Sequence, residues 1–70
     1  MILKYWTDSE FWKVIDKIKN ISFQPASDTT EIRTIFYEKE NEPNMFEMTL
    51  SPKNDAYILN DGGKTIERIN

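Results

Sequence analysis

The chain contains no cysteine and no histidine among its 70 residues, so neither a disulfide nor a thiolate or imidazole metal site can stabilise its fold. A domain of this size buries only about 60% of the surface that its unfolded chain exposes. The fold must therefore depend on large apolar side chains, and aromatic residues are prominent among them. These residues are Tyr5, Trp6, Phe11, Trp12, Phe23, Phe36, Tyr37, Phe46 and Tyr57.

The composition is that of a globular domain. Apolar residues make up 39% of the chain and charged residues 30%, which predicts one small folded domain over residues 1–70. No apolar run approaches the roughly 20 residues that span a bilayer, and the N-terminal residues lack the pattern of a signal peptide. We therefore expect a cytoplasmic protein without a membrane segment. The net charge of −3 argues against broad contact with nucleic-acid phosphates.

The first local pattern predicts a helix over residues 8–19. Thr7 and Glu10 have the spacing of a capping box, in which each side chain bonds to the other residue's amide. The apolar residues that follow have the spacing of one helical stripe, and they are Phe11, Val14, Ile15 and Ile18. Residues 2–6, ahead of this helix, are either a short strand or an extended arm.

From residue 32 onward the pattern predicts β-strands. Residues 32–37 are rich in β-branched and aromatic side chains, and residues 45–50 alternate with Phe46, Met48 and Leu50 on the core side. We expect these two strands to pair as a hairpin across residues 39–44. Residues 24–30 are expected to be a surface connection, and residues 56–59 a third strand.

The glycines at 62 and 63 predict a tight hairpin turn near the end of the chain. If they form the turn, Leu59 faces Ile66 and Tyr57 faces Arg68; a turn one residue earlier would place Leu59 opposite Lys64 instead. The first register is preferred because it pairs apolar residues with each other. Residues 65–69 are expected to be a strand, with one turn of helix as the alternative.

Together these patterns predict an α+β fold. One N-terminal helix packs on an antiparallel β-meander of about four strands, and residues 2–6 add a short edge strand in one version of this fold.

Acidic residues gather around the first predicted hairpin: Glu38, Glu40, Glu42 and Glu47. On an extended chain the first three would project from one side at intervals of about 6.5 to 7 Å. Such a line of negative charge would suit a protein partner with a basic surface. The alternative is a solvated hairpin tip whose charges serve solubility alone.

Ile35 and Tyr37 lie on the opposite strand face from Ile32 and Phe36, so both faces of this strand carry apolar side chains. One face must pack in the core, and the other is covered either by the N-terminal segment or by a partner. Ile35 and Tyr37 are therefore candidate binding residues beside the acidic group.

No sequence pattern predicts catalysis, a metal ion or a cofactor. The residues around Asn54 and Asp61 lack the spacing of a calcium loop, and the segment ending in Lys64 lacks the first glycine of a phosphate-binding loop. An alternative function is the binding of single-stranded nucleic acid, whose bases would stack on a sheet face through Tyr5, Trp6, Trp12 or Tyr37.

The sequence is thus interpreted as a non-catalytic, acidic protein-binding module, a small inhibitor or regulator of an enzyme. In size and acidity it looks like the phage-encoded inhibitors that mimic DNA, such as uracil-DNA glycosylase inhibitors, with which it shares no motif. This resemblance implies a protein of the kind that phages or mobile elements encode, which would occupy a basic groove on its target.

Overall fold

The computed structural model describes residues 1–25 and 33–70, and these residues form strands and turns with no helix. The predicted α+β class is therefore wrong, and the described chain is all-β. Its seven strands are β1 (Ile2–Trp6), β2 (Trp12–Ile15), β3 (Ile18–Pro25), β4 (Arg33–Lys39), β5 (Met45–Leu50), β6 (Ala56–Leu59) and β7 (Thr65–Arg68). They make two antiparallel sheets, one in the order β2-β1-β6-β7 and the other in the order β3-β4-β5.

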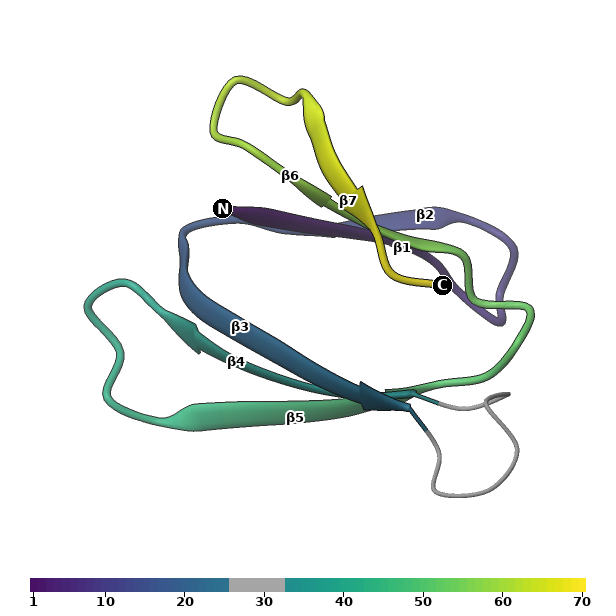
Figure 1. Ribbon diagram of the computed structural model, residues 1–70, viewed down its shortest axis with the longest axis horizontal. Coiled ribbons are helices and arrows are strands. Elements are labelled where there is room, and N and C mark those ends of the chain that lie inside the picture. The colour runs from purple at the N-terminus through teal and green to yellow at the C-terminus, as the bar shows by residue number, and fades with distance from the viewer. Residues whose placement is uncertain (26–32) are drawn as a thin grey trace.

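The two sheets lie as layers with the chain crossing between them twice (Figure 1). The first crossing is a sharp corner between β2 and β3, where Lys17 has a positive φ of 55°. Ile18, the first residue of β3, exchanges two main-chain hydrogen bonds of 2.9 Å with Met1, which fixes the corner to the start of β1. The second crossing follows β5 and leads into β6.

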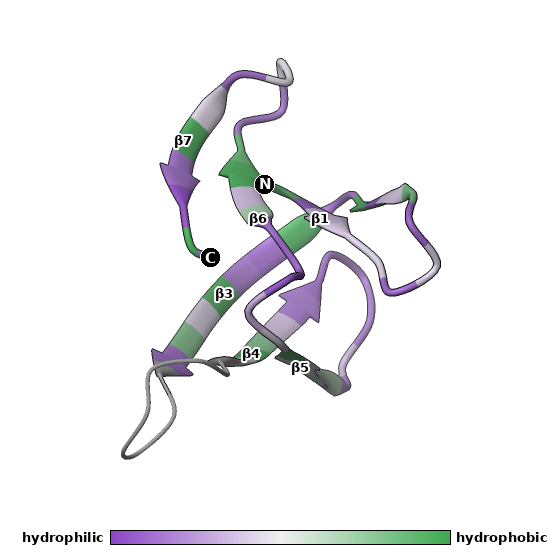
Figure 2. Ribbon diagram, turned by 90° about the vertical axis from the view of Figure 1, so that its right-hand side faces the viewer, coloured by the Kyte–Doolittle hydropathy of each residue, from purple (hydrophilic) through white to green (hydrophobic). Residues whose placement is uncertain are grey.

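The core fills the space between the layers. Its buried apolar side chains are Leu3, Ile18, Ile35, Leu50, Ala56, Ile58 and Ile69. Every second residue of a strand points to the same face, so β1, β4, β5 and β6 turn alternate side chains toward this core, whereas all four residues of β7 are exposed. Figure 2 shows the result along β3, where hydrophobic and hydrophilic bands alternate.

The residues predicted to be a helix instead form β2, a corner and the start of β3. Thr7 is not a helix cap: its hydroxyl donates to the carbonyl of Phe11 at 3.0 Å and accepts from the Phe11 amide at 3.3 Å. The amide of Glu10 donates to the Thr7 carbonyl at 3.0 Å, and Glu10 has a φ of 63°. This is a three-residue hairpin turn whose last residue is left-handed. Threonine, aspartate and serine favour both helix caps and turns, which explains the misassignment.

The turn between β6 and β7 has the same construction. Gly63, with a φ of 86°, takes the place that Glu10 occupies in the first turn, and its amide donates to the Asn60 carbonyl at 2.9 Å. The side chain of Asn60 accepts from the Lys64 amide at 3.0 Å, as Thr7 does from Phe11. Two distant hairpins therefore use one turn design with different residues.

The preferred register of the last hairpin is confirmed in part. Tyr57 faces Arg68 as predicted, but a bulge after Ile58 places Leu59 opposite Thr65 and not opposite Ile66. The alternative of a helical turn at residues 65–69 is excluded, because residues 65–68 are strand β7.

Other strand predictions are confirmed. Strands β4 and β5 pair as a hairpin, and Phe46, Met48 and Leu50 are the less exposed residues of β5. Residues 2–6 are a strand, and β1 lies inside its sheet between β2 and β6 and not at an edge. The predicted single meander is wrong, because β6 and β7 belong to the other sheet. Ile32 and most of the predicted connection at 24–30 lie outside the described residues.

Candidate functional site

The outer surface of the sheet β2-β1-β6-β7 carries a cluster of aromatic and basic side chains. Leu3 and Ile58 point to the core, so their strand neighbours point outward. Residues in antiparallel register share a face, and the register pairs Lys4 with Val14 and Tyr57, Trp6 with Trp12, and Tyr57 with Arg68. We call this surface the aromatic face, and it comprises Lys4, Trp6, Trp12, Val14, Tyr57 and Arg68.

The rings of the aromatic face contact one another. The ring centroids of Trp6 and Trp12 are 5.2 Å apart in an edge-to-face arrangement, and those of Trp12 and Tyr57 are 6.0 Å apart. The ammonium group of Lys4 lies 4.8 Å from the centre of the Trp12 ring. Aromatic pairs contribute about 0.5–1.5 kcal/mol each, and an exposed cation–π contact about 0.5–1 kcal/mol. These contacts hold the three rings and the cation in a defined arrangement.

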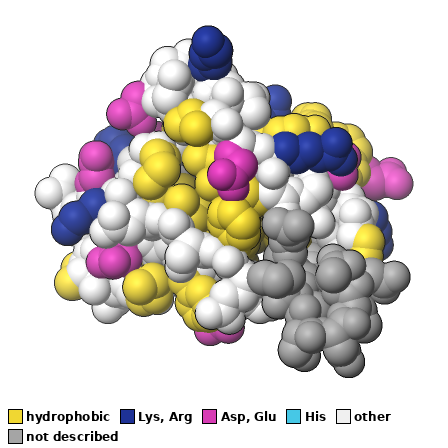
Figure 3. All heavy atoms as spheres, in the orientation of Figure 1, with side chains coloured by type: hydrophobic (Ala, Val, Ile, Leu, Met, Phe, Trp, Pro, Cys, Tyr) yellow, Lys and Arg dark blue, Asp and Glu magenta, His cyan; other side chains and the backbone are white. Residues whose placement is uncertain are grey.

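Much of this cluster is open to solvent. Trp12 is 42% exposed and Val14 is 55% exposed, while Trp6 and Tyr57 are half-buried. Phe11, in the adjoining turn before β2, is 52% exposed. Figure 3 shows apolar and basic side chains side by side over the β1–β2 end of this sheet, with acidic side chains at the margin. Contiguous apolar surface of this kind marks binding sites more often than single exposed residues do.

The acidic residues around the β4–β5 hairpin do not form one line. Strand β4 ends at Lys39, so Glu40 and Glu42 lie in the connection, where Asn41 has a φ of 64°. Glu38 is on β4, and Glu47 is on β5 opposite Phe36. Because the extended backbone stops before Glu40, the regular spacing expected along an extended arm is not present.

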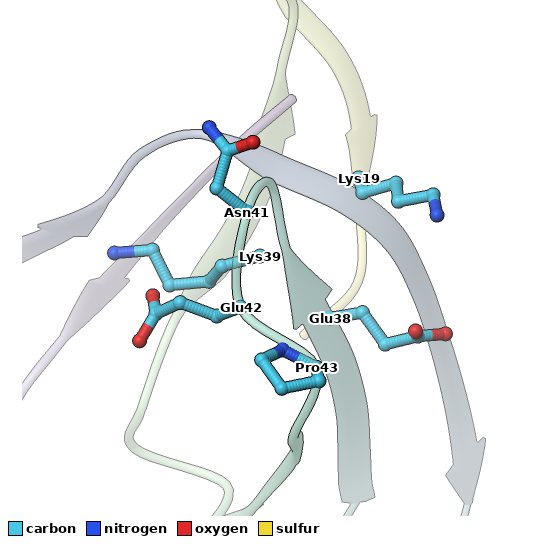
Figure 4. A pocket seen from close by; sticks show the side chains of 6 residues that line it. All are labelled: Lys19, Glu38, Lys39, Asn41, Glu42 and Pro43. Atoms are coloured by element: carbon cyan, nitrogen blue, oxygen red, sulfur yellow. The ribbon is translucent and has the colours of Figure 1, made fainter.

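Lysines accompany these carboxylates. A hollow of about 340 Å³ at the hairpin is lined by Lys19, Glu38, Lys39, Asn41, Glu42 and Pro43. Figure 4 shows Lys39 and Glu42 pointing to one side of the hairpin, whereas Lys19 and Glu38 point to the other. The ammonium group of Lys39 is also 4.0 Å from a carboxylate oxygen of Asp16. The hairpin is thus a surface of mixed charge.

Of the other two predicted binding residues, one lies in the core and one packs against it. Ile35 has no exposed surface and lies in the core cluster. Tyr37 packs against that cluster and stacks on Phe46, with ring centroids 5.1 Å apart. Burial raises the pKa of the Tyr37 hydroxyl, and the charges of Tyr5 and Glu42 raise it further. A side chain without exposed surface cannot contact a partner, so Ile35 has a structural role.

The sequence indicated Trp6 and Trp12 as candidates, but not that Tyr57, Lys4 and Arg68 join them on one face. The register of the β1–β2 hairpin is the feature that could have revealed this face. With a three-residue loop over residues 8–10, Trp6 faces Trp12, and such cross-strand aromatic pairs are typical of hairpins. Assigning Trp12 to a helix concealed this pairing.

No protein-family model, curated protein or solved structure matches the chain. Within residues 1–25 and 33–70, no group of three acidic side chains is close enough to hold a metal ion. The same described residues contain no helix long and apolar enough to cross a membrane.

Proposed function

We propose that this protein is a non-catalytic protein-binding module, a small inhibitor or regulator, and that it binds its partner through the aromatic face. One observation carries this proposal: Trp6, Trp12 and Tyr57 contact one another on the outside of the sheet, while the core is built from aliphatic side chains. Tryptophan, tyrosine and arginine are the residues most enriched at the energetic centres of protein interfaces.

The aromatic face is a better candidate than the β4–β5 hairpin. Lys19 and Lys39 accompany the carboxylates of the hairpin, so its field is partly cancelled close to the surface. Binding of a basic partner through Glu38, Glu40 and Glu42 stays a prediction. An interface also needs apolar area, and the exposed rings and Val14 supply it on the aromatic face.

Single-stranded nucleic acid is the less favoured ligand. Bases stack on open, flat ring faces. On the aromatic face the ammonium group of Lys4 lies over one side of the Trp12 ring, and Trp6 meets the same ring at an interplanar angle of 71°. The net charge of −3 also opposes a phosphate backbone. These features favour a protein partner.

Site-specific photo-cross-linking tests the proposal in the cells that encode the chain. Benzoylphenylalanine replaces Val14 in one variant and Met45 in a control; the two positions are 55% and 59% exposed, and Met45 lies on the other sheet. We expect a defined protein adduct from position 14 and none from position 45. The additional change Trp12→Ala should abolish the adduct.

Two results would overturn the proposal. One is the absence of any protein adduct from position 14 when the variant is folded. The other is an adduct of equal yield with and without Trp12→Ala. Thermal unfolding of each variant establishes that the fold is retained, and Val14→Asp replaces Trp12→Ala in a binding assay if the latter is unfolded.

A further inference from the structure

The aromatic face contains a row of side chains that crosses the sheet. Strand pairing places Val14, Lys4, Tyr57 and Arg68 side by side on four neighbouring strands. Adjacent strands are about 4.8 Å apart, so the backbones of Lys4 and Arg68 are roughly 10 Å apart with Tyr57 between them. Two cations therefore flank an aromatic ring.

These two cations lack an ionic partner within the described part of the chain. The ion pairs among residues 1–25 and 33–70 join the Met1 ammonium group to Asp61, Lys39 to Asp16, and Lys53 to Asp8. Lys4 contacts the ring of Trp12, and the Nε of Arg68 donates to the carbonyl of Asn70 at 3.3 Å. Neither contact neutralises a positive charge.

The row itself contains no carboxylate. All four strands of this sheet are among the described residues, and the register positions around Lys4 and Tyr57 hold Trp6, Trp12, Val14 and Arg68. Glu67 precedes Arg68 on β7 but faces Ile58, on the other side of the sheet, and Asp8 lies in the β1–β2 turn near Lys53. Lys4 and Arg68 are thus the charged members of this row.

We infer that the aromatic face binds an acidic protein segment, with two carboxylates spaced to reach Lys4 and Arg68 and an apolar side chain between them over Tyr57. This inference rests on the proposed function and adds the chemistry of the partner. Carboxylates pair with Lys4 and Arg68 by charge-assisted hydrogen bonds. Apolar side chains of the segment cover Val14 and the exposed surface of Trp12.

Selection of a random peptide library on the immobilised full chain tests this inference. We expect the selected peptides to be rich in aspartate and glutamate together with apolar residues. The double variant Lys4→Gln, Arg68→Gln should bind a selected peptide roughly tenfold or more weakly. The matched control is Lys13→Gln, Lys64→Gln, which removes the same charge; Lys13 faces Tyr5 on the other side of the sheet, and Lys64 lies in the β6–β7 turn. This control should bind as the wild type does.

The outcomes separate the two proposals. Peptides without acidic residues, or binding that is lost with Trp12→Ala but unchanged by the charge variant, would overturn the acidic partner and leave the aromatic face as the binding surface. Binding that is unaffected by both sets of changes would overturn both. Peptides rich in lysine and arginine, or tighter binding of an oligothymidine than of any selected peptide, would also overturn the inference.

Discussion

The side-chain amide of Asn54 donates a hydrogen bond of 2.9 Å to the main-chain carbonyl of Trp6. The same amide group donates to a carboxylate oxygen of Asp8 at 2.9 Å, while the Asn54 side-chain oxygen accepts from the amide and the hydroxyl of Ser51, both at 2.8 Å. Asn54 is a buried polar residue, and its main-chain carbonyl accepts from the Asn70 side chain at 2.8 Å. One side chain thus joins the crossing after β5 to the end of β1, beside the aromatic face.

Asn54→Ala should destabilise the protein by about 1–3 kcal/mol, because it leaves partly buried hydrogen-bonding groups of Trp6 and Ser51 unpaired. Urea denaturation of the variant and of the exposed control Asn44→Ala gives the comparison. The same change should also shift the tryptophan fluorescence spectrum, since Trp6 loses an anchor. Equal midpoints for the two variants would contradict the structural role of Asn54.

Glu10→Gly should stabilise the protein by about 0.5–1 kcal/mol. The left-handed conformation of Glu10 costs a non-glycine residue about 1–2 kcal/mol, which exceeds the 0.5–1 kcal/mol of extra chain entropy that glycine loses on folding. Gly63→Ala, at the matching position of the other turn, should destabilise it by about 1 kcal/mol. Thermal unfolding measures both. Destabilisation by Glu10→Gly would favour a helix at this place, since glycine inside a helix costs about 1 kcal/mol.

Ile35→Ala should cost about 2–5 kcal/mol of unfolding free energy, because it opens a cavity in the centre of the core. Met45→Ala, at an exposed position of the neighbouring strand, should change it by no more than about 0.5 kcal/mol. Chemical denaturation of the two variants distinguishes the core from the surface of this sheet. Comparable effects would show that the register of β4 and β5 is different.

The protein should lose stability in alkaline solution through Tyr37. Its pKa is raised above the ordinary value of 10.0, chiefly by burial, so the folded state keeps a proton that the unfolded chain has released. The resulting stability is complete below pH 10.0 and is lost as the pH rises through the folded-state pKa. Tyr37→Phe should therefore show a shallower alkaline decline of its denaturation midpoint. An identical decline in both proteins would rule this cause out.

Part of the fold could be predicted because β5 is long enough to show the alternation of apolar and polar residues that is typical of a strand. The alternation in Met45–Leu50 predicted which side faces the core, and this was confirmed. Strand β2 has only four residues and is followed by the corner at Lys17. Phe11, Val14, Ile15 and Ile18 then have helical spacing although they belong to a turn and two strands. Periodicity in so short a stretch cannot distinguish the two structures.

The aromatic face could not be predicted for a related reason. Its members come from four strands, and they meet only if the loop at residues 8–10 has three residues with the last one left-handed. Glycine usually marks that position, as Gly63 does in the other hairpin. Glu10 occupies it here, so the sequence lacks the residue that would have indicated the turn.

The pairing of β1 with β6 has a consequence for the order of events during synthesis. The β1–β2 hairpin leaves the ribosome before its neighbour β6, which follows it by about 40 residues in the sequence. Until β6 emerges, the apolar inner side of the hairpin has no complete core to cover, and Trp12 has no Tyr57 to contact. Pairings between distant segments form late because closing a long loop costs entropy. The aromatic face is therefore completed only after β6 and β7 have been made, so this surface and the finished four-stranded sheet form in the same step.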